Sequence, residues 1–195
     1  MNCPFCGFRE DRVIDRLASR QVIDEGLRIW VAGCATGEEA YSVAILLHEK
    51  LTALELPPNF KIFATDAHRE SLEFASAGLY SESSLAAVQP GRVERYFTRA
   101  DGGYRISPEI RRTVVFAPQN ILKDPPFTKI DLLCCRNLLI YFRPAAQRKV
   151  LSLFHFALNT GGFLFLGPSE SVGDLHDEFD TIDQHWRILQ KRRDL

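Results

Sequence analysis

The chain has 195 residues, of which 46% are hydrophobic and 25% are charged, and its formal net charge is −1. This composition is typical of one globular domain with a sizeable core, and the near-neutral charge predicts no general attraction to nucleic acid or anionic membranes. No apolar run approaches the ~20 residues that span a bilayer, which predicts no direct membrane insertion. Five cysteines without a secretory signal indicate a reducing compartment. We therefore expect a cytoplasmic protein.

Residues 1–26 form an atypical N-terminal segment with a single Cys-x-x-Cys pair, Cys3 and Cys6. The opening MNCPFCGFREDRVID resembles the start of the zinc ribbon of bacterial ribonucleotide reductase repressors, but the second cysteine pair of that family is absent. Structural zinc requires four ligands, and the other three cysteines lie at other predicted elements, so we predict no metal site. Asp11 to Glu25 is expected to form at most a short charged helix.

The stretch RIWVAGCATGEEAYSVAILLHEK, residues 28–50, organises the rest of the chain. Residues 29–31 are apolar and β-prone, which predicts a buried strand, and apolar residues recur at helical spacing from Ala40 to Leu51. Between them, the turn from Gly33 to Gly37 consists of small residues, so that a ligand can approach bare backbone at the start of a helix. The pattern predicts a site for a nucleotide-like cofactor, and a plain tight turn is the alternative.

Two acids, Glu38 and Glu39, follow this turn. A loop that binds pyrophosphate would not place carboxylates beside the phosphates, because like charges repel. Carboxylates suit a cofactor with positive charge, such as the ammonium and sulfonium of S-adenosylmethionine. Acids also favour a helix N-terminus, which accounts for one of the two without any ligand.

The remaining pattern is that of a doubly wound sheet. Strands are expected at 61–66, 113–117, 130–135 and 163–166, and helices at 68–77 and 144–158. A loop with Phe179 then leads to a final strand at 185–190, which should lie antiparallel beside the fifth. Asp66 ends the second strand, where an acid binds the ribose hydroxyls of a cofactor in such folds. The alternative is that Asp66 caps the following helix.

Residues 80–113 are polar and expected to be irregular except for a hairpin. The segments 96–99 and 104–107 flank the turn Asp101-Gly102-Gly103. The excess of arginine in this stretch indicates a solvated face.

Asp124-Pro125-Pro126-Phe127 resembles a motif of adenine and cytosine amino-methyltransferases. In those enzymes the motif follows the fourth strand, whereas here it precedes that strand. We interpret it as a loop and predict no nucleic-acid substrate.

Five motifs resemble the CheR-type chemotaxis receptor methyltransferases, which are S-adenosylmethionine-dependent protein-glutamate O-methyltransferases. They are GCATGEEAYS, ATD at 64–66, QNIL at 119–122, CRNLLIYF at 135–142 and GGFLFLGPSES at 161–171. The resemblance covers about residues 27–192. It implies an α/β, Rossmann-like class I methyltransferase core at 27–195, with a mostly parallel seven-stranded sheet and a small β-hairpin subdomain at about 92–112.

The resemblance also implies the site. The cofactor-binding residues would be Gly33, Ala35, Thr36, Gly37, Glu38, Glu39, Asp66, Asn120, Ile121, Asn137 and Leu138. Asn120 would hydrogen-bond to the edge of the adenine ring, or it would be only a turn residue at the end of a strand. Asn137 and Tyr141 would be the catalytic pair, Asn137 at the methionine end of the cofactor or the substrate carboxylate, and Tyr141 closing the pocket and donating a hydrogen bond. Packing at the end of the strand is the alternative for both.

The implied reaction is methylation of glutamate side chains on a chemoreceptor-like signalling domain. A glutamate with a pKa of about 4.3 is ionised at pH 7, so the site needs no general base. The family carries a helical N-terminal domain, with an arginine that reaches the active site, and we find no counterpart before residue 27. We therefore expect cofactor binding with weak transfer, and the alternative is a non-catalytic S-adenosylmethionine-binding signalling module.

Overall fold

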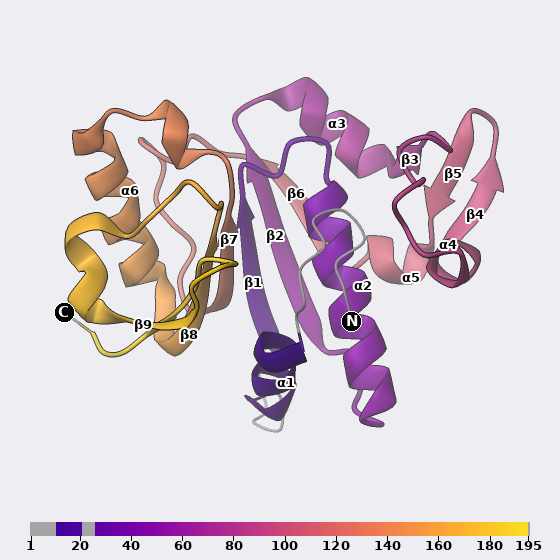
Figure 1. Ribbon diagram of the computed structural model, residues 1–195. Helices are drawn as coiled ribbons and strands as arrows, with labels where there is room; N and C mark the ends of the chain where they lie inside the picture. Colours follow the sequence, from indigo (N-terminus) through magenta and orange to yellow (C-terminus); the bar gives the residue numbers. More distant parts are fainter. Residues whose placement is uncertain (1–10, 21–25, 195) are drawn as a thin grey trace.

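The computed structural model describes residues 11–20 and 26–194, which build a seven-stranded sheet with helices on both faces and a three-stranded sheet at one end (Figure 1). The order of the large sheet is β6-β2-β1-β7-β8-β10-β9. Its strands are β1 Leu27–Ala32, β2 Phe60–Asp66, β6 Val114–Pro118, β7 Ile130–Cys135, β8 Leu158–Leu166, β9 Phe179–Asp183 and β10 Ile188–Lys191.

The strand directions confirm the predicted doubly wound, mostly parallel sheet. Strands β6, β2, β1, β7 and β8 are parallel, and β10 runs antiparallel to both β8 and β9. The final strand therefore lies beside the fifth, as predicted, but it begins at Ile188 because residues 184–187 form a turn. The prediction of a loop around Phe179 was wrong. The segment contains β9, an edge strand with one neighbour, whose mostly polar residues give little strand signal.

Successive side chains of a strand point to opposite faces of the sheet, so the core consists of two layers, one on each face. Ile29 and Val31 of β1 pack with α2 on one face, whereas Trp30 and Ala32 pack with α6 on the other. The first layer contains α1 Asp11–Arg20, α2 Glu38–Ala53 and α3 Arg69–Ala77. The second contains α6 Pro144–Ala157 and the short 3-10 helices η1 Leu139–Tyr141 and η2 Gly173–Glu178.

Helix α1 is part of this core. Val13, Ile14, Leu17 and Ala18 are buried and form one stripe of the helix, which packs beside α2. The prediction of at most a short charged helix agrees with the ten residues of α1, but it did not include this buried apolar stripe. The domain boundary between residues 26 and 27 stays a prediction. Cys3 and Cys6 lie outside the described residues.

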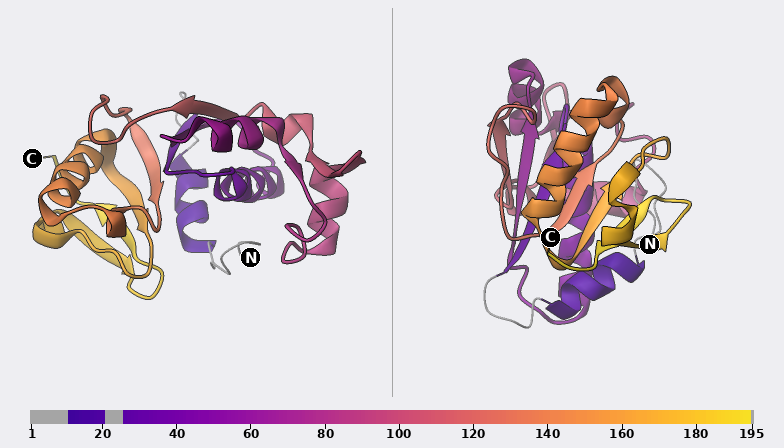
Figure 2. Two further views of the ribbon diagram at one scale, coloured as in Figure 1. Left: turned by 90° about the horizontal axis from the view of Figure 1, so that it is seen from above. Right: turned by 90° about the vertical axis from the view of Figure 1, so that its left-hand side faces the viewer.

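The small sheet lies at the end of the molecule remote from α6 (Figure 2). Its order is β3 Leu79–Tyr80, β5 Gly103–Ile106 and β4 Phe97–Ala100, and the pairing of β4 with β5 confirms the predicted hairpin. Residues 81–89 are irregular, as predicted, whereas α4 Pro90–Tyr96 and α5 Pro108–Arg111 are short helices that the prediction did not include. In both helices proline occupies the first turn, where its missing N–H costs nothing.

Arg92 of α4 links the region of the small sheet to α2 through an ion pair with Glu49. Its Nε donates to Glu49 Oε1 at 3.0 Å and its Nη2 donates to Glu49 Oε2 at 2.7 Å, and both side chains are largely buried. Glu109 of α5 contacts the same helix, through His48 Nε2 at 3.1 Å.

Two further properties concern only residues 11–20 and 26–194. None of the helices there combines the length and the apolar character needed to cross a bilayer. Histidine, cysteine and carboxylate side chains in these ranges form no group of three or more that could hold a metal ion.

Candidate cofactor and active site

The candidate site lies where the chain leaves β1 and β7, two neighbouring parallel strands. From β1 the chain passes through α2 to β2 on one side, and from β7 it passes through α6 to β8 on the other. Such a switch point opens a crevice at the carboxyl ends of the strands, which is the usual ligand position in doubly wound folds. The two segments meet closely, since a Cβ on Gly33 would lie 2.9 Å from Leu138 Cδ2.

The loop after β1 follows the end of β2. The amides of Gly33 and Cys34 donate to the carbonyl of Thr65 at 2.8 and 3.0 Å, and the amide of Ala35 donates to Asp66 Oδ2 at 2.9 Å. The other oxygen of Asp66 accepts from the amide of His68 at 2.9 Å. Each carboxylate oxygen keeps further acceptor capacity, which two ribose hydroxyls could use.

Asp66 is not the cap of the next helix, which was the alternative interpretation. His68 is the N-cap of α3, and its ring Nδ1 accepts from the amide of Ser71 at 3.3 Å. Asp66 instead bridges the β1 loop to the turn before α3. Its side chain is half-buried, so a ligand can reach it.

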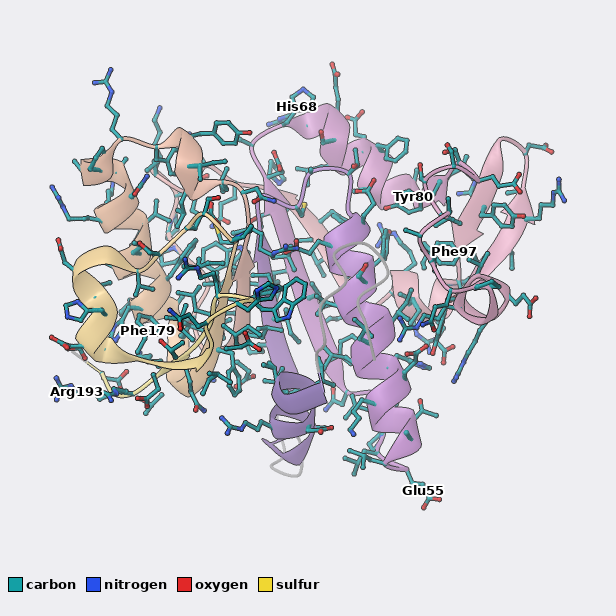
Figure 3. All side chains as sticks on the ribbon, in the orientation of Figure 1. Glu55, His68, Tyr80, Phe97, Phe179 and Arg193 are labelled. Carbon is teal, nitrogen blue, oxygen red and sulfur yellow. The ribbon has the colours of Figure 1, made fainter. Side chains whose placement is uncertain are left out.

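The second half of the loop is held by the small sheet. Tyr80 donates from its hydroxyl to the carbonyl of Thr36 at 2.8 Å, and Figure 3 shows Tyr80 near the end of α3 that faces the small sheet. Burial raises the pKa of Tyr80, which keeps this donor protonated. Gly37 caps α2 with φ of 92°, a left-handed conformation that suits glycine, and a Cβ there would lie 2.8 Å from Ala75 Cβ.

The two predicted acids at the start of α2 have different partners. Glu38 accepts from Thr36 Oγ1 at 2.7 Å, within the loop. Glu39 accepts from Arg136 Nη1 at 3.3 Å, which links α2 to the end of β7. Burial raises the pKa of Glu39, Arg136 opposes this rise, and Glu170 adds to it. Glu39 is thus a carboxylate whose ionisation is costly in this surrounding.

Residues 136–141, which follow β7, form the second wall of the crevice, and the loop after β1 forms the first. Asn137 is exposed and has φ of 57°, and half-buried Leu138 packs on the α6 layer of the core. Tyr141 is 78% exposed, so its ring lies open to solvent in this structure and does not pack over the loop. The structure thus brings Leu138 to Gly33 and Asn137 to Gly167, and leaves the predicted closing role of Tyr141 as a prediction.

Asn120 lies at the end of β6, one strand further from β1 than Asp66. Its Oδ1 accepts from the amide of Leu122 at 3.1 Å and its own amide donates to Asp124 Oδ2 at 2.7 Å. These bonds favour the turn interpretation of Asn120, and they place Asp124 of the Asp-Pro-Pro-Phe motif in a loop. Ile121 is half-buried and packs on the same core layer as Leu138.

Glu170 was missing from the predicted site. It is only 4% exposed, and its carboxylate accepts from the amides of Asn137, Leu138, Leu139 and Gly167. The only sequence signal is an acid in the small-residue turn after β8. Nothing local to that turn indicates that three of its four partners lie more than 30 residues earlier.

The charges of the assembled site fit a cationic cofactor. Glu38, Glu39, Asp66 and Glu170 surround the loop, and Arg136 is the cation that pairs with one of them. Burial, with a smaller contribution from Asp66, raises the pKa of the Cys34 thiol to about 12. Cys34 therefore stays protonated, and the loop has no thiolate nucleophile.

A separate recess of about 330 Å³ lies over β9 and β10, and Glu170, His176, Asp183 and Arg187 are among its lining residues. It does not include the loop after β1. The acids and the topology of the β1 loop favour that loop, and not this recess, as the cofactor site.

This fold, with an acid-lined loop at the switch point, defines a Rossmann-like methyltransferase core. Residues 6–188 match the family described as "CheR methyltransferase, SAM binding domain", and the chain belongs to this family. Its cofactor is S-adenosylmethionine. The match includes α1.

Known relatives extend beyond the length of this chain. A 104.1 kDa protein of Rhodobacter capsulatus is 46% identical over 183 residues, which are 94% of this chain and 19% of that protein. The chemotaxis protein methyltransferase of Vibrio parahaemolyticus is 35% identical over 93% of this chain and 66% of its own length. The chain thus spans about a fifth of the first and about two thirds of the second.

Among solved structures, a TehB-like SAM-dependent methyltransferase from Corynebacterium glutamicum superimposes with a TM-score of 0.51. The identity is 14%, over 93% of this chain and 84% of that protein. This likeness concerns the fold alone.

Proposed function

We propose that the chain transfers methyl groups from S-adenosylmethionine to glutamate side chains of a chemoreceptor-like signalling domain in the cytoplasm. The observation that carries the proposal is the meeting of the acid-lined β1 loop with Leu138 at the switch point. The chain belongs to the CheR family, and we infer that cofactor and substrate converge at this place.

Specific residues would hold the cofactor. Asp66 would accept from the ribose hydroxyls, while Glu38 and Glu39 supply negative potential toward the cationic end. Asn137 is exposed and precedes Leu138, the residue that meets Gly33, so its side-chain amide could bind the amino-acid end of the cofactor. When bound, the cofactor supplies an electrophilic methyl carbon on a sulfonium.

The chain's own contribution would be orientation and exclusion of water. A substrate glutamate is ionised at neutral pH and needs no base, which agrees with a loop whose thiol is protonated. Holding the carboxylate in line with the methyl group is worth several kcal/mol, on the order of 7–11 for ideal alignment. Asn137 and Tyr141 would perform this holding, and Tyr141 would have to move over the substrate to do so.

A transfer assay tests the proposal. The chain is incubated with methyl-labelled cofactor and a receptor signalling domain, and base-labile methyl ester is scored. A matched receptor whose methylatable glutamates are replaced by alanine is the control. Ester on the first receptor and none on the second supports the proposal; equal label on both would contradict it.

A cofactor-binding module without transfer is the second candidate. It is favoured by the Rhodobacter relative, in which a domain like this one makes up 19% of the length. Binding of S-adenosylhomocysteine together with no ester on any receptor tested would favour the module.

A further inference from the structure

Glu170 occupies an unusual position between the turns that follow β7 and β8. Its Oε1 accepts from the amides of Leu138 at 2.9 Å and Leu139 at 2.7 Å, and its Oε2 accepts from the amides of Asn137 at 3.1 Å and Gly167 at 2.6 Å. A buried carboxylate with four such bonds is fully engaged with backbone. Its hydrogen bonds therefore stabilise the conformation of these two turns.

The turn after β7 depends on such a partner. Leu138 is the N-cap and Leu139 the first residue of η1, a short 3-10 helix whose first amides have no acceptor within the helix. Asn137 is left-handed, with φ of 57°, a conformation that asparagine tolerates better than most other residues with a side chain. Glu170 satisfies the amides of this turn from another part of the chain and so stabilises the turn.

Gly167 makes the arrangement possible. A Cβ there would lie 2.7 Å from Glu170 Oε2 and 2.8 Å from Asn137 Oδ1. Real Cβ atoms essentially never come this close to another heavy atom. Gly167 thus admits both the carboxylate of Glu170 and the side chain of Asn137.

We propose that Glu170 is a positioning residue of the methyl-transfer site, which fixes Asn137 and Leu138 against the β1 loop. The proposal rests on the proposed function, since it assigns a purpose to residues 137–141 of that site. In this role Glu170 needs no contact with the cofactor, because its carboxylate is engaged with backbone amides. It acts through the four amides.

The test uses Glu170→Gln, which keeps the shape but turns an NH₂ donor toward two of the four amides. Hydrogen exchange is followed by NMR on the full chain. We expect the amides of Leu138 and Leu139 to exchange at least roughly tenfold faster, because bonds to a charged acceptor are lost. The amides of Gly33 and Cys34, which donate to Thr65, should keep their rates.

Glu178→Gln is the matched control. Glu178 is also buried, but it pairs with Arg193 at 3.1 Å and not with the β7 turn. It should leave the exchange of residues 137–139 unchanged. Equal acceleration in both variants, or acceleration of Gly33 and Cys34 by the same factor in Glu170→Gln, would overturn the proposal.

A second pair of variants guards against misfolding of the first. Gly167→Ala should displace Glu170 and Asn137 together and reproduce the exchange pattern, whereas Gly91→Ala, where a Cβ meets nothing within 4 Å, should not. Unchanged exchange at residues 137–139 in Gly167→Ala would count against the role of Glu170.

Ligand binding separates this inference from the proposed function. In calorimetry with S-adenosylhomocysteine, Glu170→Gln should bind about tenfold more weakly, because the turn that carries Asn137 and Leu138 is then held less firmly in its binding conformation. Faster exchange with unchanged affinity would reduce Glu170 to a structural residue and refute the positioning role. A folded wild-type chain that binds no S-adenosylhomocysteine would instead refute the proposed function.

Discussion

The amide of Ala35 donates to the carboxylate of Asp66 at 2.9 Å, which joins the loop after β1 to the end of β2. Asp66 is thus both a support of the loop and the residue proposed to bind ribose. The two roles are compatible because the carboxylate uses one bond per oxygen for the backbone. Removing Asp66 should therefore both loosen the loop and weaken the binding of ribose.

Asp66→Ala should weaken binding of S-adenosylhomocysteine by about 1.5–3 kcal/mol, the usual effect of losing a hydrogen bond to a charged group. Calorimetry measures this. Asp66→Asn is the matched variant, because its amide oxygen can still accept from Ala35 and should preserve the loop better. Wild-type affinity in Asp66→Ala would show that the ribose is not bound here.

Glu39→Gln should stabilise the ligand-free chain at neutral pH. The pKa of Glu39 is raised from its ordinary value of 4.5, so its ionised form is less favourable in the folded than in the unfolded state. The stability difference between variant and wild type should shrink as the pH falls through the raised pKa toward 4.5, where wild-type Glu39 is also neutral. Thermal melts across this range measure it.

The neighbouring acid provides the control for that experiment. Glu38→Gln replaces an acid in the same helical turn, one that accepts from Thr36 and does not contact Arg136 in this structure. A gain in melting temperature of the same size in both variants would point to the general charge of the loop and not to the burial of Glu39.

The ion pair between Arg92 and Glu49 should matter for stability far more than a surface pair. Arg92→Ala leaves the carboxylate of Glu49, whose side chain is 13% exposed, without its bidentate partner, and should cost about 3–5 kcal/mol in the free energy of unfolding. Arg192→Ala removes an exposed pair with Asp180 and should cost at most about 1 kcal/mol. Urea unfolding compares them, and equal costs would contradict this account.

Tyr141→Phe should leave stability unchanged within about 0.5 kcal/mol, because the side chain is 78% exposed. If its hydroxyl bonds the substrate, transfer should fall by about tenfold, the value of one hydrogen bond, while affinity for S-adenosylhomocysteine stays the same. Melting curves, calorimetry and the ester assay separate these effects. A wild-type transfer rate would remove Tyr141 from the catalytic pair.

The sequence was sufficient for those parts of the fold that have a strong local pattern. Strands such as β1 and β7 are buried on both faces and read as apolar runs, and the predicted hairpin was marked by its glycines. Edge strand β9 and helix α4 have weaker patterns, because β9 is largely polar and α4 is short. They form because the rest of the sheet and α2 offer them partners.

The residues of the site could likewise be predicted only where their signal is local in the sequence. The loop acids and Asp66 follow from the order of strands and turns in the sequence. Glu170 does not, because its function depends on amides that approach it only when β7 and β8 lie side by side. The exposure of Tyr141 is also a tertiary property.

A crystal structure of the chain with S-adenosylhomocysteine tests the central claim most directly. We predict that the ribose hydroxyls lie within hydrogen-bond distance of Asp66, and that the amino-acid end of the ligand lies between the β1 loop and Asn137. Ligand in the recess over β9 and β10, or at any place without contact to Asp66 and the β1 loop, would contradict the account.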